Sequence, residues 1–154
     1  MEAQVSVQPA TADDIDEVLR VQEASPGAAC WKRTQYEEFL QESRCIFLVA
    51  GAGSVAGFLA ARMAADELEI LNLAVEPQQR RRGIGARLLQ EALAEGRTRG
   101  ARSAWLEVRD SNQGARALYG RFGFRETYRR PRFYQDPTED AVVCRRALEP
   151  PPIA

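Results

Sequence analysis

Val75-Glu76-Pro77-Gln78-Gln79-Arg80-Arg81-Arg82-Gly83-Ile84-Gly85-Ala86 is a strand-turn-helix junction, and it decides how the rest of the chain is interpreted. Pro77 ends the strand, because proline lacks a backbone donor and restricts the residue before it. From Ile84 to Gly100, apolar residues recur at helical spacing. Glycines let backbone amides approach a ligand, and the helix start and the arginines add positive charge. The segment therefore predicts a pyrophosphate site, although a tight turn beside a solvated run of arginines is the alternative.

The segments on either side of this junction predict the order β-α-α-β-β-β-α-β-α-β-β. Alternating apolar residues between turn signals indicate the strands, and capping residues before helical apolar spacing indicate the helices. Thr34 and Glu37 form a capping-box pattern at the second helix. Strands are expected at residues 5–7, 45–50, 55–62, 68–75, 103–109, 124–129 and 141–147. The fold class is α/β or α+β, with a mixed sheet that carries helices on both faces.

Length and charge restrict the classes of protein. The 154 residues are expected to form a single domain over residues 1–149, followed by a disordered tail at 150–154. A net charge of -1 lacks the basic excess of nonspecific nucleic-acid binders, so no nucleic-acid partner is predicted. No apolar run approaches the roughly 20 residues of a membrane span, and the first residues do not read as a leader. We expect a cytoplasmic protein without a membrane partner.

The histidine and cysteine counts restrict the chemistry. The chain has no histidine, which excludes mechanisms that need an imidazole base or an imidazole metal ligand. Its three cysteines show no CxxC spacing and indicate neither a disulfide framework nor a zinc site. Cys30 has no histidine or lysine-rich setting to activate its thiol, so we interpret it as a buried packing residue. No metal is predicted.

The glycine pattern of the junction separates it from other phosphate-binding motifs. Leu88 stands where the third glycine of a dinucleotide-binding fingerprint belongs, and no Lys-Ser/Thr pair follows Gly85. Arg80-Arg81-Arg82-Gly83-Ile84-Gly85 instead resembles the Arg-x-x-Gly-x-Gly signature of the GNAT superfamily of N-acetyltransferases. This resemblance implies a mostly antiparallel central sheet and acetyl-CoA as co-substrate. It further implies cofactor contacts from Leu73, Ala74, Val75, the turn Arg80 to Ala86, and Asn112.

Two further segments resemble the RimI branch of this superfamily, whose members acetylate the N-terminal alanine of a ribosomal protein. They are Trp105-Leu106-Glu107-Val108-Arg109 and the Phe133-Tyr134 to Glu139-Asp140-Ala141 segment. By that resemblance Glu107 is the general base and Tyr119 the general acid. Trp31 and Tyr134 are implied to shape the acceptor groove, although Cys30 and Lys32 beside Trp31 depart from the pattern of the branch.

The chemistry of three of these side chains is compatible with the implied roles. A carboxylate in an apolar strand is costly unless it is paired or solvated, so Glu107 is either functional or a surface residue. A phenol such as that of Tyr119, with a pKa near 10, can protonate a thiolate whose pKa is about 8.5. Tyr119 and Trp31 could equally be packing aromatics.

The predicted reaction is direct attack of a neutral amine on the acetyl thioester, with backbone N–H groups stabilising the oxyanion. Three functions remain open: acetylation of protein N-termini, acetylation of lysines or small amines, and non-catalytic acyl-CoA binding. Glu107 and Tyr119 favour an enzyme. An α-amine has a pKa about 2.5 units below that of lysine, so a lone carboxylate base suits it better. A protein N-terminus, and within it a ribosomal protein, is the predicted partner; the sequence does not determine the oligomeric state.

Overall fold

The computed structural model describes residues 4–80 and 82–150. Its strands form a single seven-stranded sheet in the order β1-β2-β3-β4-β5-β7-β6, in which β4 and β5 are parallel and the other neighbours antiparallel. The strands are β1 (Ser6–Pro9), β2 (Cys45–Gly51), β3 (Val55–Ala64), β4 (Glu67–Val75), β5 (Ser103–Arg109), β6 (Arg125–Tyr134) and β7 (Glu139–Ala147). The helices are α1 (Ile15–Glu23), α2 (Arg33–Leu40), α3 (Ile84–Thr98) and α4 (Gln113–Arg121). The predicted order and the mostly antiparallel sheet are confirmed.

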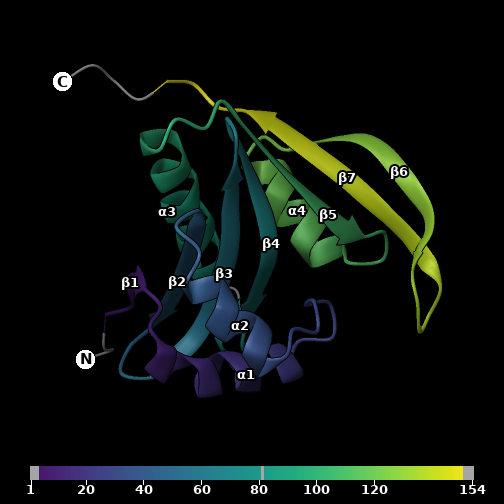
Figure 1. Ribbon diagram of the computed structural model, residues 1–154. Helices are drawn as coiled ribbons and strands as arrows, with labels where there is room; N and C mark the ends of the chain where they lie inside the picture. Colours follow the sequence, from purple (N-terminus) through teal and green to yellow (C-terminus); the bar gives the residue numbers. More distant parts are fainter. Residues whose placement is uncertain (1–3, 81, 151–154) are drawn as a thin grey trace.

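Helices cover both faces of the sheet, with α1 and α2 on one side and α3 and α4 on the other (Figure 1). Under α1 and α2, a cluster that includes Val18, Tyr36 and Phe58 is almost inaccessible to solvent. Under α3 and α4, Leu88 and Leu106 belong to a second, larger cluster. Burial of one such large apolar side chain contributes roughly 1.5–3 kcal/mol, so these two clusters hold the helices on the sheet.

The sheet opens between its two parallel strands. β4 and β5 are paired only from Glu67–Ser103 to Ile70–Leu106, and beyond that point they diverge (Figure 1). A β-bulge in β4 coincides with the end of pairing, because Ala61 lies opposite Ile70 whereas Ala60 lies opposite Asn72, which leaves Leu71 as the extra residue. The two strands therefore part after Ile70 and Leu106.

The side chain of Asn72 ties this region to the loop between α1 and α2. It is buried, its Oδ1 accepts a hydrogen bond from the Ala29 N–H (3.0 Å), and its Nδ2 donates to the Ala29 carbonyl (3.1 Å) and to the Tyr36 hydroxyl (3.1 Å). A buried amide without partners would cost about 1–3 kcal/mol, so these contacts fix the loop against β4.

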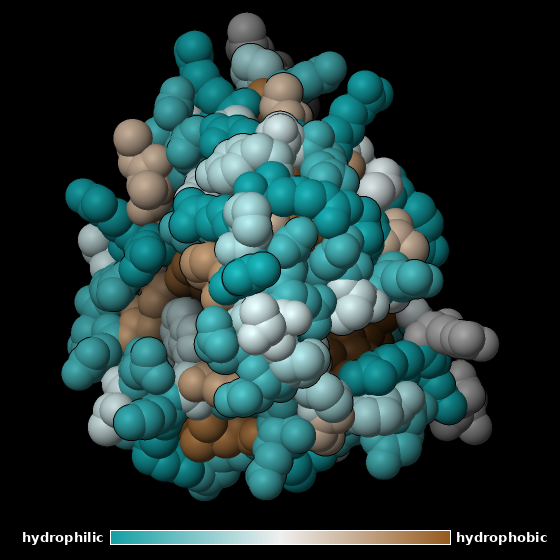
Figure 2. All heavy atoms as spheres, turned by 90° about the vertical axis from the view of Figure 1, so that its right-hand side faces the viewer, coloured by the Kyte–Doolittle hydropathy of each residue, from teal (hydrophilic) through white to brown (hydrophobic). Residues whose placement is uncertain are grey.

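β6 forms one edge of the sheet and is exposed over nearly its whole length. Seen from the β6–β7 side, the surface is mostly hydrophilic, and apolar atoms are visible mainly in recesses (Figure 2). Pro131 and the arginines of β6 discourage pairing of this free edge with another chain.

Two local predictions are wrong. α2 begins at Arg33 and not after Thr34, because the Oε1 of Gln35 accepts a hydrogen bond from the Lys32 N–H (2.8 Å) and caps the helix two residues earlier than the Thr34 pattern suggested. Cys30 is exposed and is not a packing residue. The neighbouring Trp31 instead turns inward, onto Tyr36 and Phe39.

Several boundaries also differ from the prediction. β6 continues to Tyr134, well beyond the predicted end at residue 129, because bulges allow the strand to bend while it stays paired with β7. Of the predicted tail at 150–154, only Pro150 is among the described residues, and its carbonyl accepts a hydrogen bond from Arg97 (3.2 Å). Among the described residues, no helix is long and apolar enough to cross a membrane.

Candidate active site

A cavity of about 720 Å³ lies where β4 diverges from β5 and where α3 and α4 begin. Most of the predicted cofactor residues line it, as does the predicted general acid: Leu73, Ala74, Val75, Arg80, Gly83, Ile84, Gly85, Ala86, Asn112 and Tyr119. Arg82 is exposed and is not among the lining residues, and Arg81 lies outside the described residues. The predicted residues that the cavity brings together are separated by up to 46 residues in the sequence, from Leu73 to Tyr119.

The start of α3 forms one wall of the cavity. Gly83 is the N-cap residue and has a φ of 78°, a left-handed conformation that glycine adopts without steric cost. The first intrahelical hydrogen bond of α3 runs from the Arg87 N–H to the Gly83 carbonyl (3.0 Å). The amides before Arg87 have no helical acceptor, so the wall presents backbone donors and the positive end of the helix dipole. Free backbone donors at a helix start are what the predicted pyrophosphate site requires, and the site itself stays a prediction.

The start of α4 forms another part of the wall. The Asn112 side chain caps the helix, because its Oδ1 accepts a hydrogen bond from the Ala115 N–H (3.2 Å). The loop between α1 and α2 closes over this point, and a Cβ at Gly27 would lie only 2.5 Å from the Asn112 Nδ2. A larger residue there would require the Asn112 amide to shift. The residues of this loop that line the cavity, 25–28, were missed in the sequence; the Pro-Gly turn was recognised only as the end of the first helix.

Tyr119 projects from α4 into the core beside the cavity. Its side chain is buried, and its ring meets that of Phe124 edge-on with centroids 5.8 Å apart. Burial raises the pKa of the Tyr119 phenol, and Cys144 and Tyr134 raise it further. The phenol therefore stays protonated at neutral pH and can donate a hydrogen bond to an atom in the cavity.

Glu107 lies on the other face of β5. Its neighbours Leu106 and Val108 point into the core beneath α3 and α4, so the alternation of the strand directs Glu107 to the face that carries α1 and α2. Its side chain is 18% exposed and forms an ion pair with Arg130, whose Nη2 lies 3.2 Å from the Glu107 Oε1. Glu107 is not among the residues that line the cavity. The predicted base and the predicted acid thus belong to opposite faces of the sheet.

The phenol of Tyr134 is influenced by the charges of Glu107 and Arg109. Burial raises the pKa of its phenol, and the charge of Glu107 raises it further, whereas Arg109 lowers it. Arg109 covers the ring, with its guanidinium carbon 4.4 Å from the ring centroid. Tyr134 in turn raises the pKa of the Tyr119 phenol.

Trp31 is a packing aromatic in this structure. Its ring lies 5.0 Å from that of Tyr36 and 5.3 Å from that of Phe39, within the cluster under α1 and α2. It does not line the cavity. The residues described by the structure include no group of three His, Cys, Asp or Glu side chains placed to hold a metal ion.

Comparison with known proteins identifies the family. The model of the acetyltransferase (GNAT) family matches residues 12–124, and this chain belongs to that family. The ribosomal protein bS18-alanine N-acetyltransferase of Escherichia coli K12 is 35% identical over 115 residues, which cover 73% of this chain and 78% of that protein. A protein of Bacillus subtilis strain 168 described as a putative enzyme of the same name is 31% identical over 144 residues, 93% of this chain and 95% of that protein.

Solved structures agree with this assignment. The crystal structure of the ribosomal-protein-S18-alanine N-acetyltransferase from Escherichia coli superposes with a TM-score of 0.85 at 28% identity, over 94% of each chain. Arabidopsis thaliana NAA60, solved in complex with acetyl-CoA, has the same fold with a TM-score of 0.84 at 18% identity, over 94% of this chain and 99% of that one. The fold and the family predicted from the sequence are confirmed, and the chain is an acyltransferase of the GNAT type.

The structure suggests a test of the cofactor wall. A Cβ at Gly85 would lie 3.3 Å from the Leu118 Cδ2 and 3.7 Å from the Val75 Cγ2, so little space remains between α3, α4 and β4. We expect Gly85→Val to weaken acetyl-CoA binding at least about tenfold, because the branched side chain restricts the approach to the helix amides. Isothermal titration calorimetry on the folded variant measures the loss.

Two variants control this experiment. Gly120→Ala adds a Cβ in α4 where nothing lies within 4 Å, so affinity should stay at the wild-type value. Combining Gly85→Val with Leu118→Ala makes room on the α4 side. If the double variant binds acetyl-CoA normally, the loss arises from helix packing and the pyrophosphate does not lie at Gly85.

Proposed function

We propose that this enzyme transfers the acetyl group of acetyl-CoA to the N-terminal α-amine of a protein, with an alanine-initiated ribosomal protein as the acceptor. The observation that carries the proposal is the cavity at the divergence of β4 and β5, which collects most of the predicted cofactor residues and Tyr119. The names of the two bacterial relatives support the choice of acceptor. A ribosomal protein as acceptor also places the enzyme in the cytoplasm.

The cofactor would lie across the cavity in an extended form. Its pyrophosphate is assigned to the start of α3, where free backbone amides and Arg80 supply the positive charge. Its pantetheine arm is assigned to the edge of β4 at Leu73, Ala74 and Val75, whose backbone groups have no partner on β5 beyond Ile70. The thioester then reaches the divergence, with Tyr119 on the side of the sulfur.

The opposite placement of acid and base suits direct transfer. The amine nitrogen attacks the carbonyl carbon from the face of Glu107, and the thiolate departs toward Tyr119, so the two proton transfers need separate sides of the carbonyl. Glu107 accepts the proton lost by the amine, directly or through water, and the Tyr119 hydroxyl gives its proton to sulfur as the C–S bond breaks. The products are an acetylated amine and free CoA, and no covalent enzyme intermediate forms.

The acceptor enters from the face of α1 and α2. We assign Tyr134 to one wall of the acceptor site. Trp31 contributes to the site through the α1–α2 loop, which it anchors. A lysine side chain costs roughly 3.4 kcal/mol more to deprotonate than an α-amine, since its pKa is about 2.5 units higher. A single carboxylate base therefore favours the α-amine.

Mass spectrometry tests the choice of amine. A peptide that begins with alanine and also contains a lysine should gain one acetyl group, on its first residue, and a peptide that begins with a bulky residue should react more slowly. The same peptide with a blocked N-terminus is the control and should remain unmodified. Acetylation restricted to lysine, or rapid turnover only with small amines, would move the enzyme to the alternative acceptor class. Binding of acetyl-CoA without turnover on any amine would indicate a non-catalytic acyl-CoA-binding module.

A further inference from the structure

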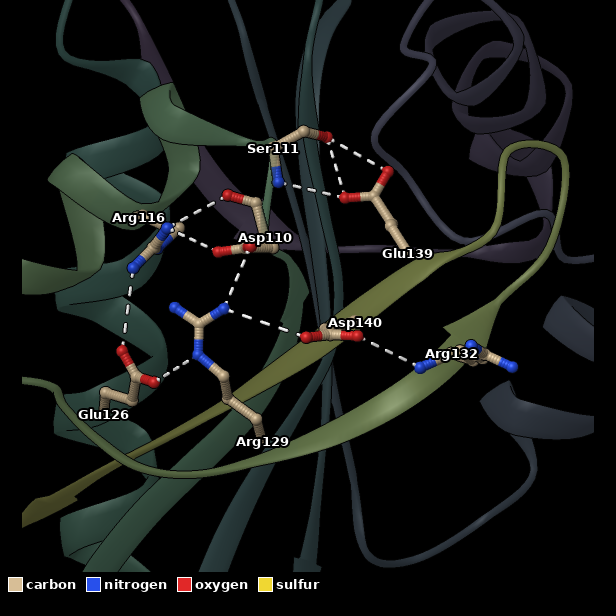
Figure 3. Close-up of polar contacts among 8 residues, drawn as sticks. All are labelled: Asp110, Ser111, Arg116, Glu126, Arg129, Arg132, Glu139 and Asp140. Atoms are coloured by element: carbon tan, nitrogen blue, oxygen red, sulfur yellow. Dashed lines mark hydrogen bonds and ion pairs between the residues drawn. The ribbon is translucent and has the colours of Figure 1, made fainter.

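Glu139 connects the turn between β6 and β7 with the turn between β5 and α4. Its carboxylate accepts hydrogen bonds from the Ser111 backbone N–H (2.9 Å to Oε1) and from the Ser111 hydroxyl (2.8 Å to Oε1, 3.1 Å to Oε2), as Figure 3 shows. Arg109 pairs with the same carboxylate, with Nη1 3.3 Å from Oε2. These donors, the Ser111 N–H foremost, lower the pKa of Glu139. The carboxylate is therefore ionised at neutral pH and well satisfied.

Arg109 extends this contact along the β6–β7 turn. Its Nη2 donates to the Gln135 carbonyl (3.2 Å) and its Nη1 to the Pro137 carbonyl (3.4 Å). Its guanidinium also covers the Tyr134 ring at 4.4 Å. A planar guanidinium presents its donors in a fixed geometry, so the carboxylate that orients Arg109 also orients the turn and the ring.

Ser111 connects the other end of the contact to the cofactor cavity. It directly precedes Asn112, the residue that caps α4, and Ser111, Asn112 and Glu139 all line the cavity. The Glu139 side chain is 16% exposed. The neighbouring ion pair between Asp110 and Arg129 in Figure 3 is more open, with side chains 40% and 39% exposed, and is screened more strongly by solvent.

From these contacts we infer that Glu139 is a positioning residue that couples the cofactor cavity to the acceptor wall. Acetyl-CoA bound against the start of α4 fixes Ser111, Ser111 holds Glu139, and Glu139 holds Arg109 and with it Tyr134. Bound cofactor thereby fixes the position of Tyr134, which forms a wall of the acceptor site. The inference rests on the proposed function, because it assigns Tyr134 to the acceptor side.

Hydrogen–deuterium exchange of Glu139→Gln measures this coupling without an acceptor. In the wild-type protein, saturating acetyl-CoA should slow exchange of the backbone amides of residues 134–139. In Glu139→Gln the cofactor should bind with a Kd within about threefold of wild type, yet the slowing should be lost, since the amide carries no charge to orient Arg109. With an amine that wild type acetylates, the acceptor KM should rise on the order of tenfold.

Matched variants separate positioning from a general loss of structure. Ser111→Ala removes only the hydroxyl contact and should give a partial effect, whereas Ser111→Thr keeps the hydroxyl and should restore the wild-type response. Glu95→Gln removes a carboxylate paired with Arg99 in the last turns of α3, away from the cavity, and should respond as wild type. Glu139→Gln combined with Arg109→Lys should raise the acceptor KM by less than the product of the single effects, because both act through one contact.

Equal slowing of the 134–139 amides in wild type and in Glu139→Gln would overturn the inference, as would equal rises in the acceptor KM and the acetyl-CoA Kd. A failure of the proposed function looks different. Wild type would then bind no acetyl-CoA, or would acetylate lysine or small amines and no α-amine. In the second case, the exchange readout and the KM comparison with the accepted amine still decide the role of Glu139.

Discussion

Glu107→Gln is expected to lower kcat by a factor on the order of 10² to 10⁴ while leaving the acetyl-CoA Kd nearly unchanged. Glutamine keeps the shape of the side chain beside Arg130, but it loses the charge of the ion pair and cannot take a proton from the amine. Glu107 lies outside the cofactor cavity, so binding and chemistry should separate. Single-turnover rates with saturating acetyl-CoA, together with calorimetry, measure the two effects.

Glu67→Gln is the matched control for this experiment. Glu67 lies on β4, on the same face as Glu107, and is likewise paired with an arginine, Arg145. Removing its charge should change kcat by less than about twofold, because a partly exposed ion pair contributes little. If folded Glu107→Gln acetylates at the wild-type rate from pH 6 to 9, Glu107 is not the base.

Tyr119→Phe is expected to reduce kcat by about 10² to 10³, since it removes a preorganised donor to the departing thiolate. The ring stays packed against Phe124, so stability and acetyl-CoA affinity should change little. Burial raises the pKa of the Tyr119 phenol, so the hydroxyl remains protonated through pH 9. The wild-type rate should therefore show no loss from ionisation of Tyr119 between pH 6 and 9.

The control for Tyr119 is Tyr128→Phe, which removes a hydroxyl from an exposed tyrosine of β6. It should leave kcat within about twofold of wild type. The pH–rate profile and thermal unfolding of both variants complete the comparison. A Tyr119→Phe enzyme that is folded and fully active would assign the ring to packing alone, and the thiolate would then leave without an acid.

Local patterns predicted much of the fold because each depends on neighbouring residues. Pro77, Gly83 and the apolar spacing after Ile84 specify a strand, a turn and a helix within a few residues, and the structure contains all three. The cap of α4 by Asn112 is likewise local, because its side chain accepts a hydrogen bond from Ala115, three residues later. The arginine run before Gly83 was less informative, because of its two described members, Arg80 and Arg82, only Arg80 lines the cavity.

Contacts distant in sequence were not predictable in this way. Glu139 meets Ser111 across 28 residues, and nothing near either residue indicates the pairing. Asn72 contacts Ala29, 43 residues away in the sequence. The contact depends on the bulge in β4, and an apolar strand gives no clear sequence signal for a bulge. The sheet separates Glu107 from Tyr119, and this follows from the alternation of side chains along β5. The alternation could be used only once it was known which face of β5 lies against α4.

The extra residue in β4 shifts the alternation of its side chains by one residue partway along the strand. Before the bulge, Leu68 and Ile70 face α3 and α4; after it, Leu73 and Val75 do, while Leu71 and Asn72 both turn to the opposite side. On the cofactor side of the sheet, even-numbered residues of β4 therefore lie before the bulge and odd-numbered residues after it. Deleting Leu71 would restore regular pairing with β3 and leave Leu73 and Val75 on the cofactor side, because both residues keep their β3 partners. The extra residue therefore does not decide which side chains face the cofactor. A gene shorter by that one codon would keep every motif residue outside β4 and lose only the irregularity at which β4 leaves β5.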